Sequence, residues 1–252
     1  MKYLLLLAFA VLLLVNCQNE PDNKLIYGNP PAEGFNLDGS DSLAISLADS
    51  IMEKMGGRQN WDETNYLIWN FFGARKHYWN KKTGDIRIES VRDSTIYLMN
   101  IHNMEGKVKI GESLQTEPDS LKNLLINGKS MWINDSYWLV MPYKLKDSGV
   151  TLTYAGADTT QAGKPADMLQ LTFNGVGETP DNKYIVYVDK DRQLITQWAF
   201  YSDFSDVEPR FVTPWDDYQQ YGNILLAGNR GRGALTEIAA PDSLDNRIFQ
   251  EF

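Results

Sequence analysis

The chain is poor in cysteine, histidine and positive charge. Its 252 residues include one cysteine and two histidines, and 24 basic residues face 33 acidic ones, for a net charge of −9. A single cysteine excludes an internal disulfide. Nucleic-acid binding depends on phosphate contacts from lysine and arginine, so no nucleic-acid partner is expected. The chain also lacks a polybasic surface for anionic lipids, and any membrane contact should therefore be covalent or apolar.

Sequence motifs for enzymatic chemistry are missing as well. His77 and His102 do not stand at a metal-binding spacing such as HExxH, and the chain has no GxSxG, Walker or dinucleotide-binding motif. The Gly- and Arg-rich stretch 228–233 could bind phosphate, but without a Lys-Ser/Thr pair a surface loop is favoured. Acidic groups such as Asp203 with Asp206 could hold calcium, yet carboxylates gather at turns in any case. We expect no cofactor, no metal and no catalytic residue.

Long hydrophobic runs are absent too. The longest is Tyr3–Val15, with 13 apolar residues after Met1-Lys2. A bilayer-spanning helix needs about 20 residues, so this run is typical of a signal peptide, predicted over 1–16. An uncleaved anchor is the alternative.

The lone Cys17 follows this run directly. Leu14-Val15-Asn16-Cys17 resembles a bacterial lipobox, although Asn16 stands where a small residue is usual. The resemblance implies cleavage before Cys17 and attachment of a lipid (palmitate among its acyl chains) to that residue. The membrane would then be a partner through the N-terminal lipid.

Proline, glycine and polar residues dominate the next stretch. Pro21, Pro30, Pro31 and several glycines predict a flexible tether over 17–40, with a single folded domain over 41–252. Within that domain Leu43–Met55 carries apolar residues at helical spacing, and Gly56-Gly57 should end this helix. A second helix is predicted over Pro118–Trp132.

The rest of the domain has the pattern of short strands. They are predicted over 66–72, 75–80, 85–91, 95–102, 107–110, 137–145, 150–156, 168–174, 184–189, 193–202, 211–215, 223–227 and 234–238. Both faces of 95–102 are partly apolar, so something should cover each face. Helices and closely spaced strands predict an α+β fold of mainly antiparallel sheet. We expect a strongly curved, partly open β-barrel or half-barrel, with one or two covering helices.

Three stretches resemble the lipoprotein-carrier superfamily of LolA and LolB. They are the helix ending Met55-Gly56-Gly57 before Trp61, the segment 137–154, and Tyr187–Asp191 running to Trp198-Ala199-Phe200-Tyr201. The resemblance implies an open curved sheet with helices across a hollow that binds acyl chains. With the lipobox it implies the cell envelope of a Gram-negative bacterium, with lipid anchoring at the outer membrane.

Aromatic residues make up 12 % of the chain and fall largely on the predicted strands. They can form a core, or they can line an apolar pocket. The pocket candidates are Trp69, Phe71, Tyr97, Trp138, Trp198 and Phe200. We therefore expect a non-catalytic lipoprotein that binds a lipid or another hydrophobic ligand. The alternatives are a structural or assembly lipoprotein without a ligand, and a hydrolase of envelope glycans or esters.

Overall fold

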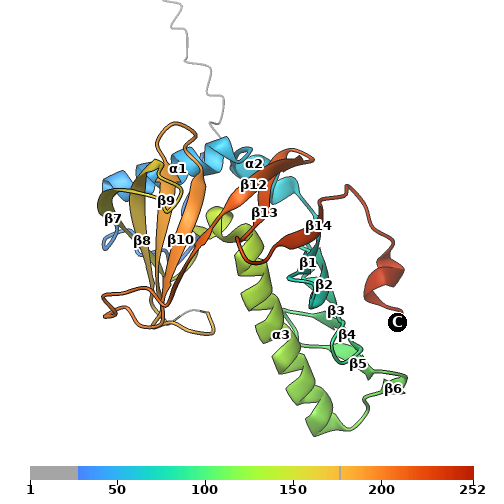
Figure 1. The fold of residues 1–252 in the computed structure, drawn as a ribbon. Coiled ribbons are helices and arrows are strands. Elements are labelled where there is room, and N and C mark those ends of the chain that lie inside the picture. The colour runs from blue at the N-terminus through green and yellow to red at the C-terminus, as the bar shows by residue number, and fades with distance from the viewer. Residues whose placement is uncertain (1–27, 176) are drawn as a thin grey trace, which may run out of the picture.

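The computed structural model describes residues 28–175 and 177–252, which form antiparallel sheets around one long helix (Figure 1). A seven-stranded sheet has the order β14-β1-β2-β3-β4-β5-β6, a five-stranded sheet the order β11-β10-β9-β8-β7, and β12 pairs with β13. The sheets do not close on one another, so the predicted α+β fold, an open curved half-barrel, is confirmed. The predicted signal peptide and Cys17 lie outside the described residues.

The strands lie close to their predicted positions. Those of the seven-stranded sheet are β1 (Tyr66–Phe71), β2 (Arg75–Asn80), β3 (Asp85–Ser90), β4 (Thr95–Asn100), β5 (Gly106–Ile110), β6 (Ser113–Leu114) and β14 (Leu235–Ala239). The five-stranded sheet contains β7 (Val150–Thr159), β8 (Pro165–Phe173), β9 (Lys183–Asp189), β10 (Ile195–Tyr201) and β11 (Phe211–Pro214). The hairpin between them consists of β12 (Asp216–Tyr221) and β13 (Ile224–Asn229), of which β12 is not predicted by the sequence.

The long helix α3 runs from Pro118 to Val140 and lies between the two larger sheets (Figure 1). The Glu117 side chain caps its start by accepting hydrogen bonds from the amides of Asp119 and Ser120. Gly128 sits where a Cβ would come within 3.0 Å of Tyr97 and Met99 on β4. The glycine that weakens the helical pattern therefore allows α3 to approach the sheet closely.

The predicted strand over 137–145 is wrong. Residues 137–140 form the last turn of α3, and η1 (Met141–Lys144) continues as a 3₁₀ helix. Aromatic and β-branched residues favour a strand on their own. Here burial of Leu139, Val140 and Tyr143 in the core outweighs that local preference.

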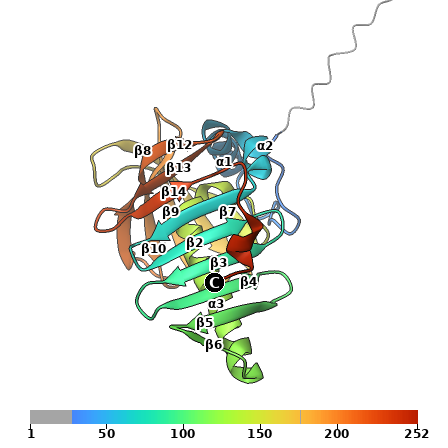
Figure 2. The ribbon, with the colours of Figure 1, turned by 90° about the vertical axis from the view of Figure 1, so that its right-hand side faces the viewer.

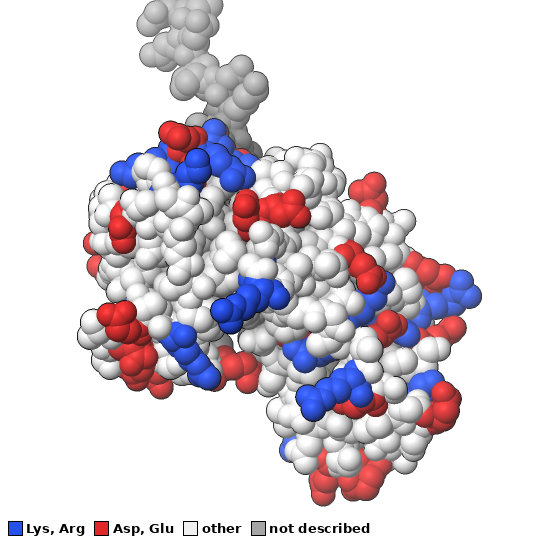
Figure 3. Space-filling view, viewed as in Figure 1, with Lys and Arg blue, Asp and Glu red and all other residues white. Residues whose placement is uncertain are grey.

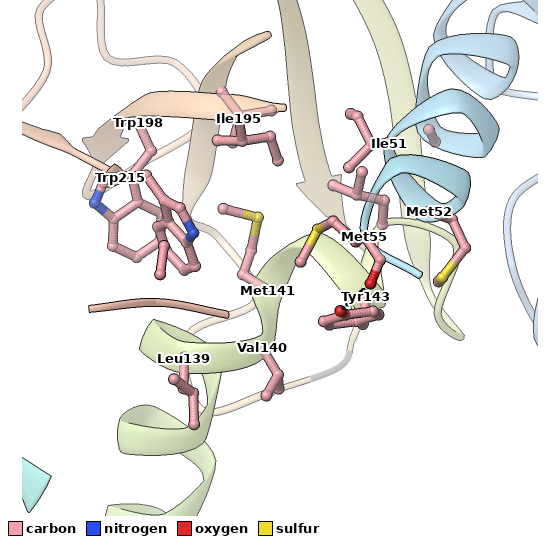
Figure 4. Close-up of a cluster of buried hydrophobic side chains, with 14 of the residues drawn as sticks. Ile51, Met52, Met55, Leu139, Val140, Met141, Tyr143, Ile195, Trp198 and Trp215 are labelled. Atoms are coloured by element: carbon pink, nitrogen blue, oxygen red, sulfur yellow. Dashed lines mark hydrogen bonds between the residues drawn. The ribbon is translucent and has the colours of Figure 1, made fainter. Parts of the chain in front are cut away.

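Two helices lie at one end of the fold, the first beside β7 of the five-stranded sheet and the second beside β13 (Figure 1). The first, α1 (Ser42–Lys54), buries Ala44, Ala48 and Ile51, while Leu43 of the predicted apolar stripe is 51 % exposed. The second, α2 (Gly57–Glu63), is not predicted by the sequence, and it buries Trp61. Figure 4 shows α1 side chains meeting the end of α3 and η1, where the Tyr143 hydroxyl donates to the carbonyl of Met55 at 2.8 Å.

Part of the predicted tether packs against the domain. The amide of Ala32 donates to the carbonyl of Lys146, the amide of Asn36 donates to that of Val150, and Phe35 is buried. The segment thus covers part of the free edge of β7. Residues 32–40 differ from the expected flexible coil because Phe35 and the edge of β7 give them apolar contacts and hydrogen-bond partners.

The seven-stranded sheet is covered by α3 on one face and, over part of the other face beside β3 and β4, by the C-terminal segment, as the apolar pattern of 95–102 predicts. Figure 2 shows α3 behind this sheet and the C-terminal segment in front of it. That segment contains η2 (Asn246–Phe249), and Arg87 on β3 donates to the carbonyls of Ile248 and Glu251. Leu98 on β4 is consequently only 2 % exposed.

Candidate functional site

Two adjoining cavities lie between α3 and the five-stranded sheet, with volumes of about 160 and 270 Å³. The smaller is lined by Ile133, Asn134, Tyr137, Trp138, Phe173, Gly177, Glu178, Thr179, Tyr184 and Trp198. The larger is lined by Trp79, Trp132, Ile133, Ser136, Tyr137, Val140, Lys144, Asp147, Ser148, Val150, Phe173 and Gly177. Ile133, Tyr137, Phe173 and Gly177 line both, so the two cavities are neighbours with these side chains between them, and the pair is called the aromatic cavity below.

The wall of the aromatic cavity combines side chains from one face of α3 with side chains from β9 and β10. Ile133 and Tyr137 are four residues apart on α3 and therefore share one face of the helix. Tyr184 on β9 and Trp198 on β10 stack in parallel, with ring centroids 5.1 Å apart. Tyr137 approaches the ring of Tyr184 to 5.6 Å. The result is a wall of aromatic faces with few polar atoms, as in most small-molecule pockets.

Four buried polar atoms in this wall are left without a partner among the described residues: the Tyr137 hydroxyl and the indole nitrogens of Trp79, Trp132 and Trp198. Burial raises the pKa of Tyr137 well above its usual value, so the hydroxyl stays protonated and can donate a hydrogen bond. A buried donor left unpaired costs about 1–3 kcal/mol, which a ligand oxygen at this position would recover.

Polar side chains surround the rims of the aromatic cavity. Lys144 and Asp147 form an ion pair at the larger cavity, and both side chains are about one-third exposed. At the smaller cavity Ser130 on α3 donates to Glu178 at 2.9 Å. In Figure 3 the surface is notched between the lower end of the five-stranded sheet and α3, with acidic and basic side chains along the edge of the notch. A ligand with an apolar body and a polar end would fit this distribution.

A buried ionic cluster fixes α3 beside the cavity. The Asp135 carboxylate, fully buried, accepts hydrogen bonds from Arg75 at 2.6 and 2.8 Å and lies 2.7 Å from Nε2 of His77. Burial works to raise the pKa of Asp135, but the bonds to His77 and Arg75 outweigh it and hold that pKa below its usual value. Burial lowers the pKa of His77. The cluster therefore consists of a carboxylate, a guanidinium and a neutral imidazole that donates to the carboxylate.

The His77–Asp135 pair is sealed from solvent. His77 is fully buried, its ring stacks on Trp69 with centroids 4.5 Å apart, and its Nδ1 has no partner within the described chain. A general base must reach the proton it removes, directly or through one water. This geometry gives the pair a structural role in positioning α3 and provides no support for a hydrolase.

Arg230, in the Gly- and Arg-rich stretch, points inward instead of lying on a surface loop. It is 3 % exposed, and its guanidinium lies 3.6 Å from the ring centroid of Trp215. It donates to the carbonyls of Trp138, Ala227 and Asn229. Burial lowers its pKa. A cation at the last turn of α3 is favoured by the helix dipole, so Arg230 holds the helix end next to the cavity.

The six pocket candidates separate into two groups. Trp138 and Trp198 line the aromatic cavity, and Phe200 packs beside it, 5.4 Å from Tyr184. Trp69 and Phe71 belong to the main core, and Tyr97 belongs to a second core between β3, β4, β5 and α3. The structure therefore brings half of the candidates to the cavity.

Other cavity residues are absent from those candidates. Ile133, Tyr137 and Phe173 line both cavities and Tyr184 lines the smaller one. Tyr137 falls in the segment predicted as a strand. The spacing of Ile133, Tyr137 and Val140 fits one face of a helix and could have identified this wall.

The described residues contain no group of three or more His, Cys, Asp or Glu side chains that could hold a metal. Over the same residues, every helix is too short or too polar to cross a bilayer.

Comparison with known proteins finds no matching family model and no matching curated protein. Among solved structures, the chain is similar to a DUF1329 family protein from Desulfovibrio piger, with 13 % identity and a TM-score of 0.42 over 82 % of this chain and 97 % of that one. It is also similar to a domain named as an outer membrane lipoprotein-sorting protein from Vibrio parahaemolyticus, with 10 % identity and a TM-score of 0.36 over 81 % and 97 %. A third, MucB, gives 12 % identity and a TM-score of 0.26 over 75 % and 66 %. Scores this low carry no conclusion about function, and membership in the carrier superfamily stays a prediction.

Proposed function

We propose that this chain is an envelope lipoprotein, anchored through Cys17, that binds an acyl chain or a similar apolar ligand in the aromatic cavity without catalysis. The observation that carries the proposal is an apolar hollow with unpaired donors in its wall, of which the Tyr137 hydroxyl lies between the two cavities. The carboxyl or ester oxygen of a lipid is an acceptor that matches this donor.

The size of the cavity limits the ligand. The two volumes together fall near the lower end of the roughly 300–1,000 Å³ range of small-molecule pockets, so they suit one chain better than several. Each buried methylene contributes about 0.8 kcal/mol, so eight of them contribute roughly 6 kcal/mol before the costs of association. With about 1–3 kcal/mol from the Tyr137 hydrogen bond the gross gain is roughly 7–9 kcal/mol, and the costs of association then place the Kd above the micromolar value that −8 kcal/mol would give.

A pair of tryptophan substitutions on α3 tests the proposal. Ile133→Trp would fill the hollow from a residue that lines both cavities. Ile126→Trp is the matched control, because Ile126 is 46 % exposed and lines neither cavity. We expect a fluorescent fatty acid to bind the unsubstituted protein, to bind Ile133→Trp at least tenfold more weakly, and to bind Ile126→Trp with unchanged affinity. Failure of the unsubstituted protein to bind the fatty acid, or equal binding by both variants, would favour a structural or assembly protein whose cavity binds no ligand.

The role of the Tyr137 hydroxyl is tested separately. Tyr137→Phe keeps the ring and removes the hydrogen-bond donor, so the affinity for a fluorescent fatty acid should fall several-fold. The affinity for a fluorescent hydrocarbon of the same chain length, which has no carboxyl group, should not change. A loss of affinity for both ligands would mean that the ring, not the hydroxyl, is what they need.

A further inference from the structure

Ala32 and Gly34 lie beside the loop that lines part of the aromatic cavity. Gly149 donates its amide to the carbonyl of Gly34 at 2.8 Å, and Ala32 donates to that of Lys146 at 2.9 Å. A Cβ on Gly34 would stand 2.6 Å from Oγ of Ser148. Ser148 lines the larger cavity, as does Asp147 beside it. The chain thus enters the folded domain along the loop that forms one side of the cavity mouth.

This entry point is fixed by side chains as well as by the backbone. Asn29 donates to Asp49 on α1 at 2.9 Å, and Lys146 forms an ion pair with the same carboxylate at 2.5 Å. The Lys146 side chain is only 5 % exposed, so this contact is partly shielded from water. Phe35 is buried in the main core. The chain is therefore fixed against α1 at Asn29 and reaches the loop at the cavity mouth at Ala32 and Gly34.

Few residues separate Cys17 from the first described residue. Ten residues, 18–27, separate Cys17 from Gly28. Fully extended, ten residues span at most about 36 Å. A short linker of this kind gives an attached ligand an effective concentration in the millimolar range. A lipid on Cys17 therefore competes for the cavity at a concentration that free fatty acids do not reach in solution.

We propose that the aromatic cavity takes an acyl chain of the protein's own Cys17 lipid whenever no bilayer accepts it. The proposal rests on the proposed lipidation and on the proposed ligand site. The mouth suits such a ligand because its polar rim, with Lys144 and Asp147, can face the glyceryl and peptide end of the lipid while the chain lies along Tyr137. In a bilayer every acyl chain of the anchor is buried, so the cavity is then free for another ligand.

The inference has a measurable consequence for competition. If the cavity binds a free fatty acid with a Kd of about 10 μM, a tethered chain at about 1 mM weakens the apparent affinity roughly 100-fold. The lipidated protein in detergent-free buffer should therefore bind a fluorescent fatty acid about 100-fold more weakly than the Cys17→Ser protein. The lipidated protein in a phospholipid nanodisc should regain the affinity of Cys17→Ser.

Photocrosslinking identifies the occupant directly. We would place p-benzoylphenylalanine at position 173, which lines both cavities, and at position 204 as the control, since Phe204 is 62 % exposed and lines neither. After detergent removal, the probe at 173 should crosslink to the N-terminal lipopeptide of the same chain, and the probe at 204 should not. The crosslinked product should have the mass of one chain.

The outcomes separate the two proposals. If Cys17→Ser crosslinks an added fatty acid from position 173 but the lipidated chain shows no crosslink to its own lipopeptide, the ligand site stands and this inference is wrong. A crosslink between two chains, or aggregation of the lipidated protein while Cys17→Ser stays monomeric, overturns it as well. If Cys17→Ser captures no fatty acid either, the proposed function itself fails.

Discussion

Replacing Asp135 by alanine should destabilise the protein by about 3 kcal/mol. The substitution removes the shared acceptor of Arg75 and His77, which together make three contacts of 2.6 to 2.8 Å with the carboxylate. Breaking a buried ion pair by removing one partner costs about 3–5 kcal/mol, because the other charge stays buried and uncompensated. The Arg75 side chain is 24 % exposed, so water can replace part of the hydrogen bonding that it loses with Asp135. The expected loss of stability is therefore at the lower end of this range.

Urea unfolding followed by far-UV circular dichroism measures this loss, with the Cys17→Ser protein as the lipid-free background. For a domain of this size about 3 kcal/mol also lowers the Tm by roughly 6–12 °C. Asp62→Ala is the control, since Asp62 forms a 2.9 Å ion pair with Arg58 at a solvent-exposed site. Such pairs contribute at most about 1 kcal/mol. If Asp135→Ala loses no more stability than Asp62→Ala, the buried cluster does not anchor α3.

Three further predictions concern the same fold. Gly56→Ala should lower the free energy of unfolding by at least about 2 kcal/mol, because Gly56 has φ of 110° and a Cβ there would stand 2.2 Å from the carbonyl oxygen of Asn223. Gly57→Ala, at φ of 85° with open space around it, should lower it by only about 1 kcal/mol. Thermal melts measure both losses. Arg230→Met should lower the Tm, since three carbonyl acceptors lose their donor. The backbone amides at the end of α3 should also exchange faster with solvent in hydrogen-exchange measurements. Unchanged exchange there would contradict a capping role for Arg230. Burial lowers the pKa of His77, so near pH 6.5 the unfolded chain binds a proton that the folded chain does not. The free energy of unfolding should therefore fall from pH 7 to pH 5. If His77→Phe shows the same dependence on pH, the imidazole is not the cause of this fall.

The sequence predicts most of the strands because their information is local. Alternating residues in β9 and β10, and the turn at Lys190, specify an antiparallel pair whatever the rest of the chain does. The partly apolar outer face of 95–102 likewise indicates a cover, which the structure identifies as the C-terminal segment. The open curved half-barrel follows from such local signals together with the short loops.

The end of α3 could not be predicted in the same way. Tyr137, Trp138 and Val140 prefer strands, and Gly128 weakens the helix, so local preference ends it too early. The helix continues because Gly128 permits close contact with β4 and because Asp135 finds its partners on β2, 58 and 60 residues away along the chain. Contacts at that separation leave no periodic trace in the sequence.

The sequence by itself determined the strand pattern, the mainly antiparallel α+β class, and the prediction of a signal peptide over 1–16 that ends before Cys17. Only the tertiary structure decided which aromatic residues line a hollow and which fill a core. Trp69 and Trp198 are both buried tryptophans on strands, yet one stacks on a buried histidine and the other faces the cavity. The difference arises from the path of α3 across the sheets, which depends on packing and on one buried carboxylate.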